Sequence, residues 1–503
     1  MVAVETSGGL ASPGNLRRLL IGIALLSTSL VLLLMSLNST VIPMEAVKRS
    51  GVILAVYILG LFTLMLAFRG PGFGPGSWRL GPWMMIWAAT MFGIASSINM
   101  GNYQLGNASQ LILSNVLNAL WLIAVGMTAW LAAYLIGPGR LTEKAVSRWT
   151  SFLKERYTEE IRGSAPWLLY AIGSSARIIL ILSTAQLGYV GDVASATTTA
   201  SWYDHGLISL QFCAPVGVAT AMLVALRRPS RGAWATVVLM APAEAAYALI
   251  SGNKTPFVVV ILAIIIPYAA VRRGLPWKLL VIFAIAFFAV VIPFNNSYRQ
   301  TARTGTTTIS VQQAVNAAPG VLGGTFSDGS GLTNKFLTSV NDVLNRSQYI
   351  VVVAIIMQDT PSEIPYIPQS QMFTGIVSGM IPRLIWPGKP IGGGSGLEQA
   401  YFGIGPTRHT STAFTLFGSL YAYGGWGPLV FGMLLVGFLF RILDDTIDVR
   451  GDPHTVFIPL FLFQALVTME EGWVSTVLSV VLFIPVWVLA VALAFRPRRR
   501  ALA

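Results

Sequence analysis

The segment SGMIPRLIWPGKPIGGG, residues 378–394, holds Arg383 and Lys389 in a backbone that is restrained by prolines. The run of glycines at its end would let the backbone approach a ligand closely. Cations held rigidly outside a helix suit the recognition of phosphate, and arginine can bind phosphate through two parallel hydrogen bonds. Trp386 lies between the two cations and suits either a sugar face or the membrane interface. An interfacial turn with a tryptophan anchor would have the same composition, so both interpretations stand at this point.

Six more cations are candidate phosphate ligands, because membrane topology alone does not explain their positions. They are Arg177, Lys254, Arg299, Arg303, Arg346 and Arg408. Arg177 differs from the rest because it falls in the middle of a predicted span, as does Glu244. Charges inside a membrane are usually paired or functional. Either these two residues form a structural pair, or Arg177 contacts a phosphate and Glu244 orients it.

Proton transfer needs a further group, and the sequence offers three candidates for a general base. His409, in PTRHTSTAF, suits proton transfer near neutral pH, and the adjacent Arg408 favours its neutral form by charge repulsion. A histidine that caps a helix start at the interface would fit the same position. Glu398 and the pair Glu470–Glu471 are the alternative bases. The sequence shows no cluster with metal-ligand spacing, so we expect a reaction without metal or cofactor.

The elements that position these residues are membrane helices. The chain has 503 residues, a mean hydropathy of +0.68 and 11% charged residues, whereas a soluble domain has about 25%. The net charge of +13 does not indicate nucleic-acid binding, because most cations fall in short loops and at the termini. The sequence therefore predicts an all-α polytopic membrane protein. Its apolar runs predict twelve spans, near residues 19–37, 51–68, 81–98, 111–136, 167–190, 206–226, 233–251, 256–271, 277–294, 412–440, 455–469 and 473–495.

The distribution of cations predicts which side of the membrane each loop occupies. An even number of spans places both termini on one side, and 22 of the 33 Lys and Arg residues fall on that face, which we assign as cytoplasmic. Mixed charge and helical spacing of apolar residues predict an amphipathic helix at 138–166 on this face. Residues 1–294 then carry nine spans, 295–411 form a large outer loop, and 412–503 carry three spans and a basic tail. An apolar piece at 348–357 is too short to cross, and we expect it on, or dipping into, the outer half of the bundle.

The proline-bounded segment also carries a family resemblance. MIPRLIWPGKP closely resembles the Pro-Arg-Trp-Lys-Pro motif of Wzy-type O-antigen and oligosaccharide repeat-unit polymerases. Four further pieces are similar to that family in the same order: SGNKTPFVVVILAIII, NNSYRQTAR, LNRSQYIVVVAIIMQDTP and the glycine-punctuated span STAFTLFGSLYAYGGWGPLVFGMLLVGFLFRIL. The resemblance covers about residues 250–445. One departure is Ser419, which stands where the family often has an acidic residue before a tyrosine.

The resemblance implies a GT-C-like, inverting and metal-independent glycosyltransferase in the bacterial plasma membrane, with both termini cytoplasmic. Such an enzyme transfers a glycan from an undecaprenyl diphosphate carrier onto another lipid-linked repeat unit on the outer face. The diphosphate ligands would be Arg383, Lys389, Arg346, Arg299 and Arg303, with Arg408, Arg177 and Lys254 as further candidates. Trp386 and Tyr401 would contact sugar or the interface, and His409 or Glu398 would be the base. A chain-length regulator is a possible partner.

Two other functions remain open. A glycan ligase related to the O-antigen ligases would differ only in its acceptor. A lipid-linked glycan transporter or flippase would place its charges along a path inside the spans. Only Arg177 and Glu244 are predicted in the middle of a span, while the remaining candidate cations cluster outside the spans, which favours an enzyme.

Overall fold

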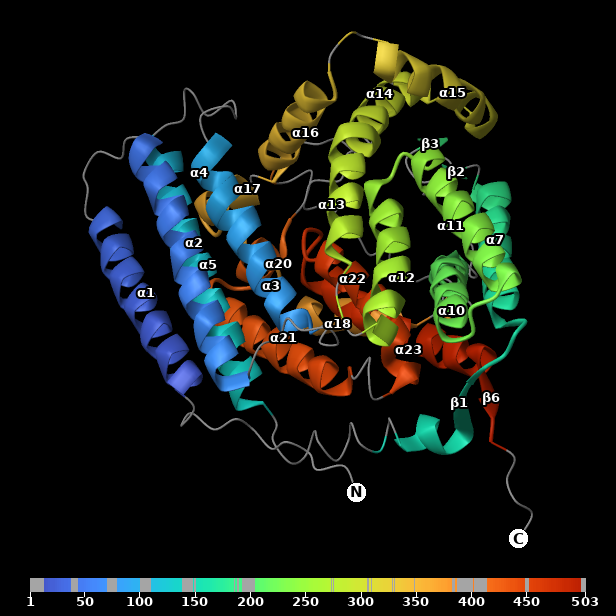
Figure 1. Ribbon diagram of the computed structural model, residues 1–503. Helices are drawn as coiled ribbons and strands as arrows, with labels where there is room; N and C mark the ends of the chain where they lie inside the picture. The colour runs from blue at the N-terminus through green and yellow to red at the C-terminus, as the bar shows by residue number, and fades with distance from the viewer. Residues whose placement is uncertain are drawn as a thin grey trace.

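The computed structural model is a bundle of long helices, with a few short strands at its ends (Figure 1). It describes residues 13–37, 44–69, 79–99, 110–137, 148, 151–184, 186–187, 190–191, 204–272, 274, 276–304, 307–308, 310–327, 329, 331–347, 349–381, 385–386, 401, 414–447 and 452–498. The statements below concern these residues.

The first half of the chain folds into helices with few interruptions. They are α1 (Pro13–Leu37), α2 (Met44–Arg69), α3 (Leu80–Ala88), the π-helical η1 (Ala89–Ile94), α4 (Ala95–Asn99), α5 (Gln110–Ile136), α7 (Ala165–Thr184), α9 (Asp204–Leu210), α10 (Cys213–Arg227), α11 (Arg231–Ile250) and α12 (Lys254–Arg272). Three short strands accompany them, namely β1 (Tyr157–Ile161), β2 (Gln186–Leu187) and β3 (Val190–Gly191).

The second half contains shorter helices before it returns to long ones. They are α13 (Trp277–Ala286), the π-helical η3 (Phe287–Val291), α14 (Ile292–Ala302), α15 (Val311–Ser327), α16 (Leu332–Arg346), α17 (Tyr349–Asp359), α18 (Ser370–Met380), α20 (Leu416–Ala422), α21 (Trp426–Thr446), the 3-10 helix η4 (Pro453–Phe457), α22 (Ile458–Thr468) and α23 (Trp473–Ala494). The strands here are β4 (Arg303–Thr304), β5 (Thr307–Thr308) and β6 (Phe495–Pro497).

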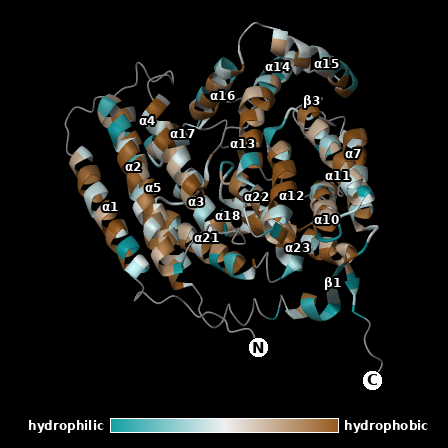
Figure 2. Cartoon of the chain, in the orientation of Figure 1, coloured by the Kyte–Doolittle hydropathy of each residue, from teal (hydrophilic) through white to brown (hydrophobic). Residues whose placement is uncertain are grey.

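Ten helices within the described ranges are long and apolar enough to cross a membrane, so the protein is an all-α, multi-pass membrane protein. Helices satisfy their own backbone hydrogen bonds, which an apolar environment requires. Helices α1, α2 and α5 form one side of the bundle and α7, α10, α11 and α12 the other, while α20–α23 lie between them (Figure 1). Figure 2 shows hydrophobic residues along most of the long helices and hydrophilic residues at β1.

Two of the twelve predicted spans are not among the ten helices that are long and apolar enough to cross a membrane. The segment predicted at 81–98 is the continuous α3–η1–α4 unit, and the one predicted at 455–469 is the short η4–α22 unit. The span predicted at 412–440 begins later than expected, because a turn at 423–425 separates α20 from α21. The amphipathic helix predicted over 138–166 is wrong for Tyr157–Ile161, which forms strand β1 and pairs with β6.

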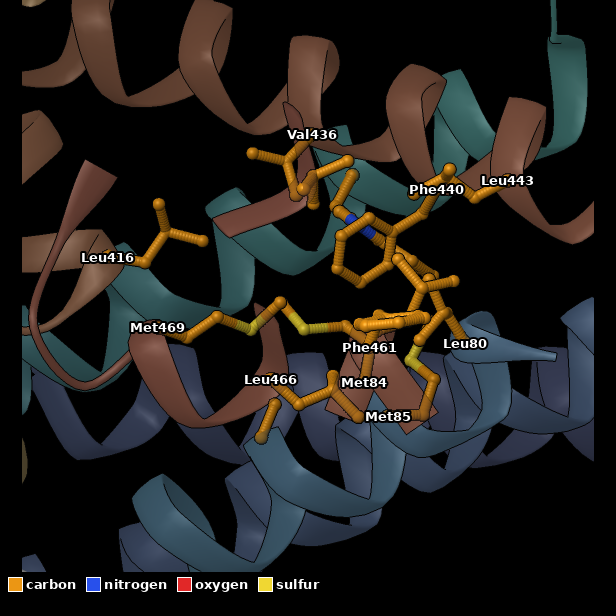
Figure 3. Close-up of a cluster of buried hydrophobic side chains, with 14 of the residues drawn as sticks. Leu80, Met84, Met85, Leu416, Val436, Phe440, Leu443, Phe461, Leu466 and Met469 are labelled. Carbon is orange, nitrogen blue, oxygen red and sulfur yellow. The ribbon is translucent and has the colours of Figure 1, made fainter. Parts of the chain in front are cut away.

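A continuous apolar core holds the two sides of the bundle together. Side chains from α3, α20, α21 and α22 meet around Met84, Phe440 and Phe461 (Figure 3). Helices α5 and α21 run side by side and pack closely at Gly437. A Cβ atom at this position would lie only 2.2 Å from the Trp130 carbonyl oxygen. This core fixes α20 and α22, two short helices that carry candidate site residues at their ends.

Ionic contacts gather at one end of the bundle, which we call the basic end and define by Arg69, Arg441, Arg228 and Arg496. Asp445 accepts hydrogen bonds from Arg69 at 2.5 Å and from Arg441 at 2.6 Å. Glu160 of β1 pairs with Arg228 at 2.9 Å and with Arg496 at 3.2 Å. These contacts tie the ends of α2, α10 and α21 and strand β6 to one face of the protein.

The basic end also contains a buried histidine. His454 contacts Asp452 through Nδ1 at 2.7 Å, and its Nε2 lies 3.2 Å from the Thr158 carbonyl oxygen of β1. Lys154 lies 3.4 Å from the other oxygen of Asp452. His454 therefore connects β1 to the start of η4.

Much of the predicted outer loop is helical. Helices α15, α16, α17 and α18 all fall within 295–411, and α14 begins before that range. The short apolar piece forms α17, whose residues Ile350–Ala354 are buried against α5 and α20. The prediction of a non-spanning helix there is confirmed, and that helix lies inside the bundle rather than on its surface.

Candidate functional site

Two groups of polar side chains lie at the end of the bundle opposite the basic end. The first, which we call the Lys254 cluster, joins the α11–α12 turn to α14 and α16 through Lys254, Asn296, Asp342 and Arg299. The second, which we call the Glu470 cluster, joins α17 to α20 and to the α22–α23 turn through Tyr349, Thr415 and Glu470. Asp342 of α16 and Tyr349 at the start of α17 are only seven residues apart, so one corner of the chain contributes to both clusters.

The Lys254 cluster connects three elements that are distant in sequence. Lys254 Nζ lies 3.4 Å from Asn296 Oδ1, and Asn296 Nδ2 donates to Asp342 Oδ2 at 3.0 Å. Arg299 Nε donates to the carbonyl oxygen of Gly252 at 2.7 Å. Gly252 has φ of +64°, a conformation that favours glycine, and this turn places Lys254 at the first position of α12. The structure thus brings together two predicted phosphate ligands, Lys254 and Arg299.

Two buried polar side chains of α14 border this cluster. Asn295 is completely buried, and neither its amide nitrogen nor its amide oxygen bonds with a described residue. Tyr298 stacks on Phe294 with ring centroids 5.3 Å apart, and its hydroxyl likewise bonds with none of the described residues. An unpaired buried polar group costs about 1–3 kcal/mol. Asn295 and Tyr298 therefore offer hydrogen-bonding capacity that the described fold does not use.

The Glu470 cluster lies where the chain turns between α22 and α23. The Glu470 carbonyl oxygen accepts a hydrogen bond from the Thr415 amide at 2.8 Å, and its side chain accepts one from Tyr349. Burial and, less strongly, the neighbouring Glu471 raise the pKa of Glu470, against the Tyr349 hydrogen bond, which lowers it. Thr415 adopts φ of +60°, and its hydroxyl caps α20 by accepting from the Gly418 amide at 3.1 Å. Of the predicted pair of alternative bases, Glu470 is half-buried and Glu471 is exposed.

Tyrosines surround the end of α17 beside this cluster. The hydroxyl groups of Thr360 and Tyr401 lie 2.5 Å apart, and the Tyr401 ring packs edge-on against Phe414 at 5.4 Å. Burial raises the pKa of Tyr401. The ring of Tyr366 lies 6.3 Å from that of Tyr421. Tyr401 and Phe414 flank segment 402–413, so the chain enters and leaves that segment at neighbouring points.

Several predicted site residues lie outside the described part of the chain. These are Arg383, Lys389, Glu398, Arg408 and His409, together with the side chains of Arg303 and Arg346. The backbone of Arg346 is described and ends α16, one turn after Asp342, so both positions share a face of that helix. The Trp386 side chain is exposed, as an interfacial or sugar-contacting residue would be.

Arg177 lies apart from both clusters and is paired. Its Nη1 and Nη2 atoms donate to the two carboxylate oxygens of Glu244 at 2.5 and 2.8 Å. The Tyr247 ring lies 4.0 Å from the guanidinium carbon, and both charged side chains are buried between α7 and α11. This geometry corresponds to the structural pair, the first of the two interpretations of these residues.

Sequence reasoning overlooked Asn295, Asn296, Asp342 and Tyr349 as site residues. The first two lie in NNSYRQ at the end of a span, where adjacent asparagines are a usable signal. No local signal identifies Asp342, because its partner Asn296 lies 46 residues away. The chemistry available at this end is therefore broader than cations alone: two cations, buried amide and hydroxyl groups, and a carboxyl group whose pKa is raised.

The comparisons with known proteins identify a family. Residues 168–447, more than half of the chain, match the family described as Domain of unknown function (DUF8712), and the chain belongs to that family. The match includes both polar clusters except for Glu470. No curated protein and no solved structure matches the chain.

Proposed function

We propose that this protein is a Wzy-type polysaccharide polymerase, a GT-C-like glycosyltransferase of the bacterial plasma membrane. It transfers an undecaprenyl-diphosphate-linked glycan onto another lipid-linked repeat unit on the outer face. In this proposal the basic end faces the cytoplasm, and α3–η1–α4 and η4–α22 cross the membrane in addition to the ten long helices. The basic end carries several of the arginines that predict the cytoplasmic face, as the positive-inside rule requires.

One observation carries the proposal. Three segments that resemble the polymerase family, SGNK, NNSYR and the LNRSQY corner, meet at the same end of the bundle although about one hundred residues separate the first from the last. Lys254 of the first segment contacts Asn296 of the second, and Asn296 bonds with Asp342, which lies two residues before the third. A resemblance scattered over unrelated surfaces would not support a site, whereas this convergence supports one.

The reaction requires a single displacement at the anomeric carbon of the donor glycan. The acceptor hydroxyl oxygen forms the new bond, the bond from that carbon to the carrier diphosphate breaks, and the diphosphate leaves with the electron pair. Lys254 and Arg299, with Arg383 and Lys389 from the motif, stabilise the charge that develops on the leaving group. The hydroxyl proton goes to His409 or to Glu470, whose raised pKa makes it a stronger base than an ordinary carboxylate.

The test is complementation of a deletion strain, with glycans and lipid-linked oligosaccharides separated on a gel. Wild type should give long chains, and Arg383→Ala and His409→Ala should leave single repeat units on lipid. Lys48→Ala is the matched control, because Lys48 pairs with the exposed Glu45 at 3.4 Å and belongs to neither polar cluster. It should retain wild-type chains. Membrane levels of each variant are measured in parallel.

Two results would contradict the proposal. Long lipid-linked polymer that accumulates in the deletion strain without transfer to a final acceptor would identify a ligase. An unchanged glycan profile in the deletion strain would remove the glycosyltransferase assignment and favour a transporter.

A further inference from the structure

Helix α18 is too short to cross a membrane. Its 11 residues, Ser370–Met380, span about 16 Å at 1.5 Å per residue, roughly half the hydrocarbon thickness of a bilayer. The helix lies between α21 and α23 in Figure 1. It ends at Met380, two residues before Pro382, so its depth is the depth at which the chain enters the proline-bounded segment.

Contacts with α23 fix the direction of α18. A Cβ atom at Gly375 would lie 3.0 Å from Val474, and one at Gly379 would lie 2.2 Å from Leu478. Trp473 Nε1 donates to the Met372 carbonyl oxygen at 2.9 Å. Residue numbers rise along both helices from one contact to the next, so α18 runs parallel to α23.

These contacts also give the depth of α18. Helix α23 is long and apolar enough to cross the membrane, and it starts at Trp473, on the end opposite the basic end. Leu478 lies five residues, about 7.5 Å, further along that span. On the other side, the Phe373 ring lies 6.4 Å from Phe431, which is five residues into the span formed by α21. The end of α18 therefore lies inside the layer that both spans cross.

The opposite face of α18 is apolar and exposed. Phe373, Val377 and Met380 follow one another at helical spacing and are 47%, 57% and 47% exposed. Beyond the helix, Ile385 is 74% exposed and Trp386 42% exposed. At the depth of the two spans, the medium beside such a surface is hydrocarbon.

We propose that α18 is a re-entrant membrane helix, whose exposed face contacts the hydrocarbon chains of lipids in the leaflet opposite the basic end. The glycines at 375 and 379 let it pack closely against α23, and the apolar stripe faces away from α23. The chain then leaves α18 at Met380, at the depth of the two spans. Given the polymerase function proposed above, a lipid-linked substrate reaches the end of α18 sideways, without leaving the bilayer.

Spin labelling tests this placement in lipid nanodiscs. The background is Cys213→Ala, because Cys213 is the only cysteine and is buried. A nitroxide is attached at Val377→Cys, and its collision rates with oxygen and with a water-soluble nickel chelate are measured. Ser362→Cys, in the exposed turn that follows α17, is the aqueous control. Val238→Cys, 66% exposed in the α11 span, is the lipid control.

We expect the Val377 label to collide with oxygen several-fold more often than with nickel, with a ratio between those of the two controls. A ratio equal to that of Ser362 would overturn the proposal, because α18 would then lie in water. Low collision rates with both reagents would also overturn it, because protein rather than lipid would cover the stripe. None of these outcomes depends on catalysis, so the placement of α18 and the polymerase function can fail independently.

Discussion

The buried pair Arg177–Glu244 allows a sharp test, because its two partners can be removed separately or together. Both charged side chains are at least nine-tenths buried between α7 and α11. Arg177→Met leaves the Glu244 carboxylate without its guanidinium partner. Removing one member of a buried ion pair typically costs about 3–5 kcal/mol. Loss of the contact with the Tyr247 ring adds roughly 0.5–2 kcal/mol.

The double variant Arg177→Met/Glu244→Met should recover most of that stability. Replacing a whole buried pair by apolar residues of similar size is often neutral or even stabilising. The assay follows thermal unfolding through the reaction of Cys213 with a fluorogenic maleimide. This thiol is free and buried at the start of α10, and its neighbour Ala214 packs against Gly173 of α7. Unfolding of the layer that holds the pair therefore exposes the reporter.

Glycan synthesis by the same variants separates the two interpretations of Arg177. If the pair is structural, the double variant unfolds at nearly the wild-type temperature and still makes polymer. A double variant that folds stably but makes none would assign Arg177 to the substrate. The physical reasoning itself would be refuted if Arg177→Met unfolded like wild type, or if the double variant were as unstable as the single one.

Three further predictions concern packing, pH and unused polar groups. Gly437→Ala should lower the free energy of unfolding by about 1–3 kcal/mol, because its Cβ would meet the Trp130 carbonyl, while Gly427→Ala on the same helix has open space and should be neutral in the same thermal assay. Burial raises the pKa of Glu470 in the folded protein, so its charged form lowers the free energy of unfolding. This loss is absent below about pH 4, where the carboxyl is protonated in both the folded and the unfolded states. It is complete above the raised pKa of the folded state. Glu470→Gln should therefore stabilise the protein at neutral pH and lose that advantage in acid; equal gains at both pH values would contradict this. Asn295→Leu should raise the unfolding temperature, because it removes two unpaired buried atoms, and should lower polymer yield if its amide contacts substrate.

Hydropathy predicted the long helices well, because backbone satisfaction in hydrocarbon leaves few alternatives to a helix. The cost of a charge inside a membrane identified Arg177 and Glu244 as partners, since both fall in the middle of a predicted span. It did not recognise the link from Lys254 through Asn296 to Asp342, because such a link depends on how α12, α14 and α16 pack. A contact of this kind leaves no trace in local composition.

Strand β1 was missed for a related reason. The charges and aromatic residues of Tyr157–Ile161 continue the helical spacing of the preceding residues, so a helix was the natural prediction. The partner of this segment is β6, more than three hundred residues later in the chain. His454 adds a second anchor, since its Nε2 faces the Thr158 carbonyl. The strand is therefore specified by two distant segments rather than by its own sequence.

The turn between α20 and α21 places Ser419 at the start of α23, where it has a structural role. Gly424 and Gly425 have φ of +144° and +77°, so the apolar run cannot continue as one helix and α20 stays separate beside the α22–α23 turn. There Ser419 Oγ accepts a hydrogen bond from the Trp473 amide at 2.8 Å, which satisfies one of the unpaired amides at the start of α23. A carboxylate at position 419 could accept the same bond, and it would interact favourably with the helix start. An acidic residue at position 419 would therefore serve the same structural purpose as serine, so under the proposed polymerase function the departure at Ser419 does not by itself remove a catalytic acid.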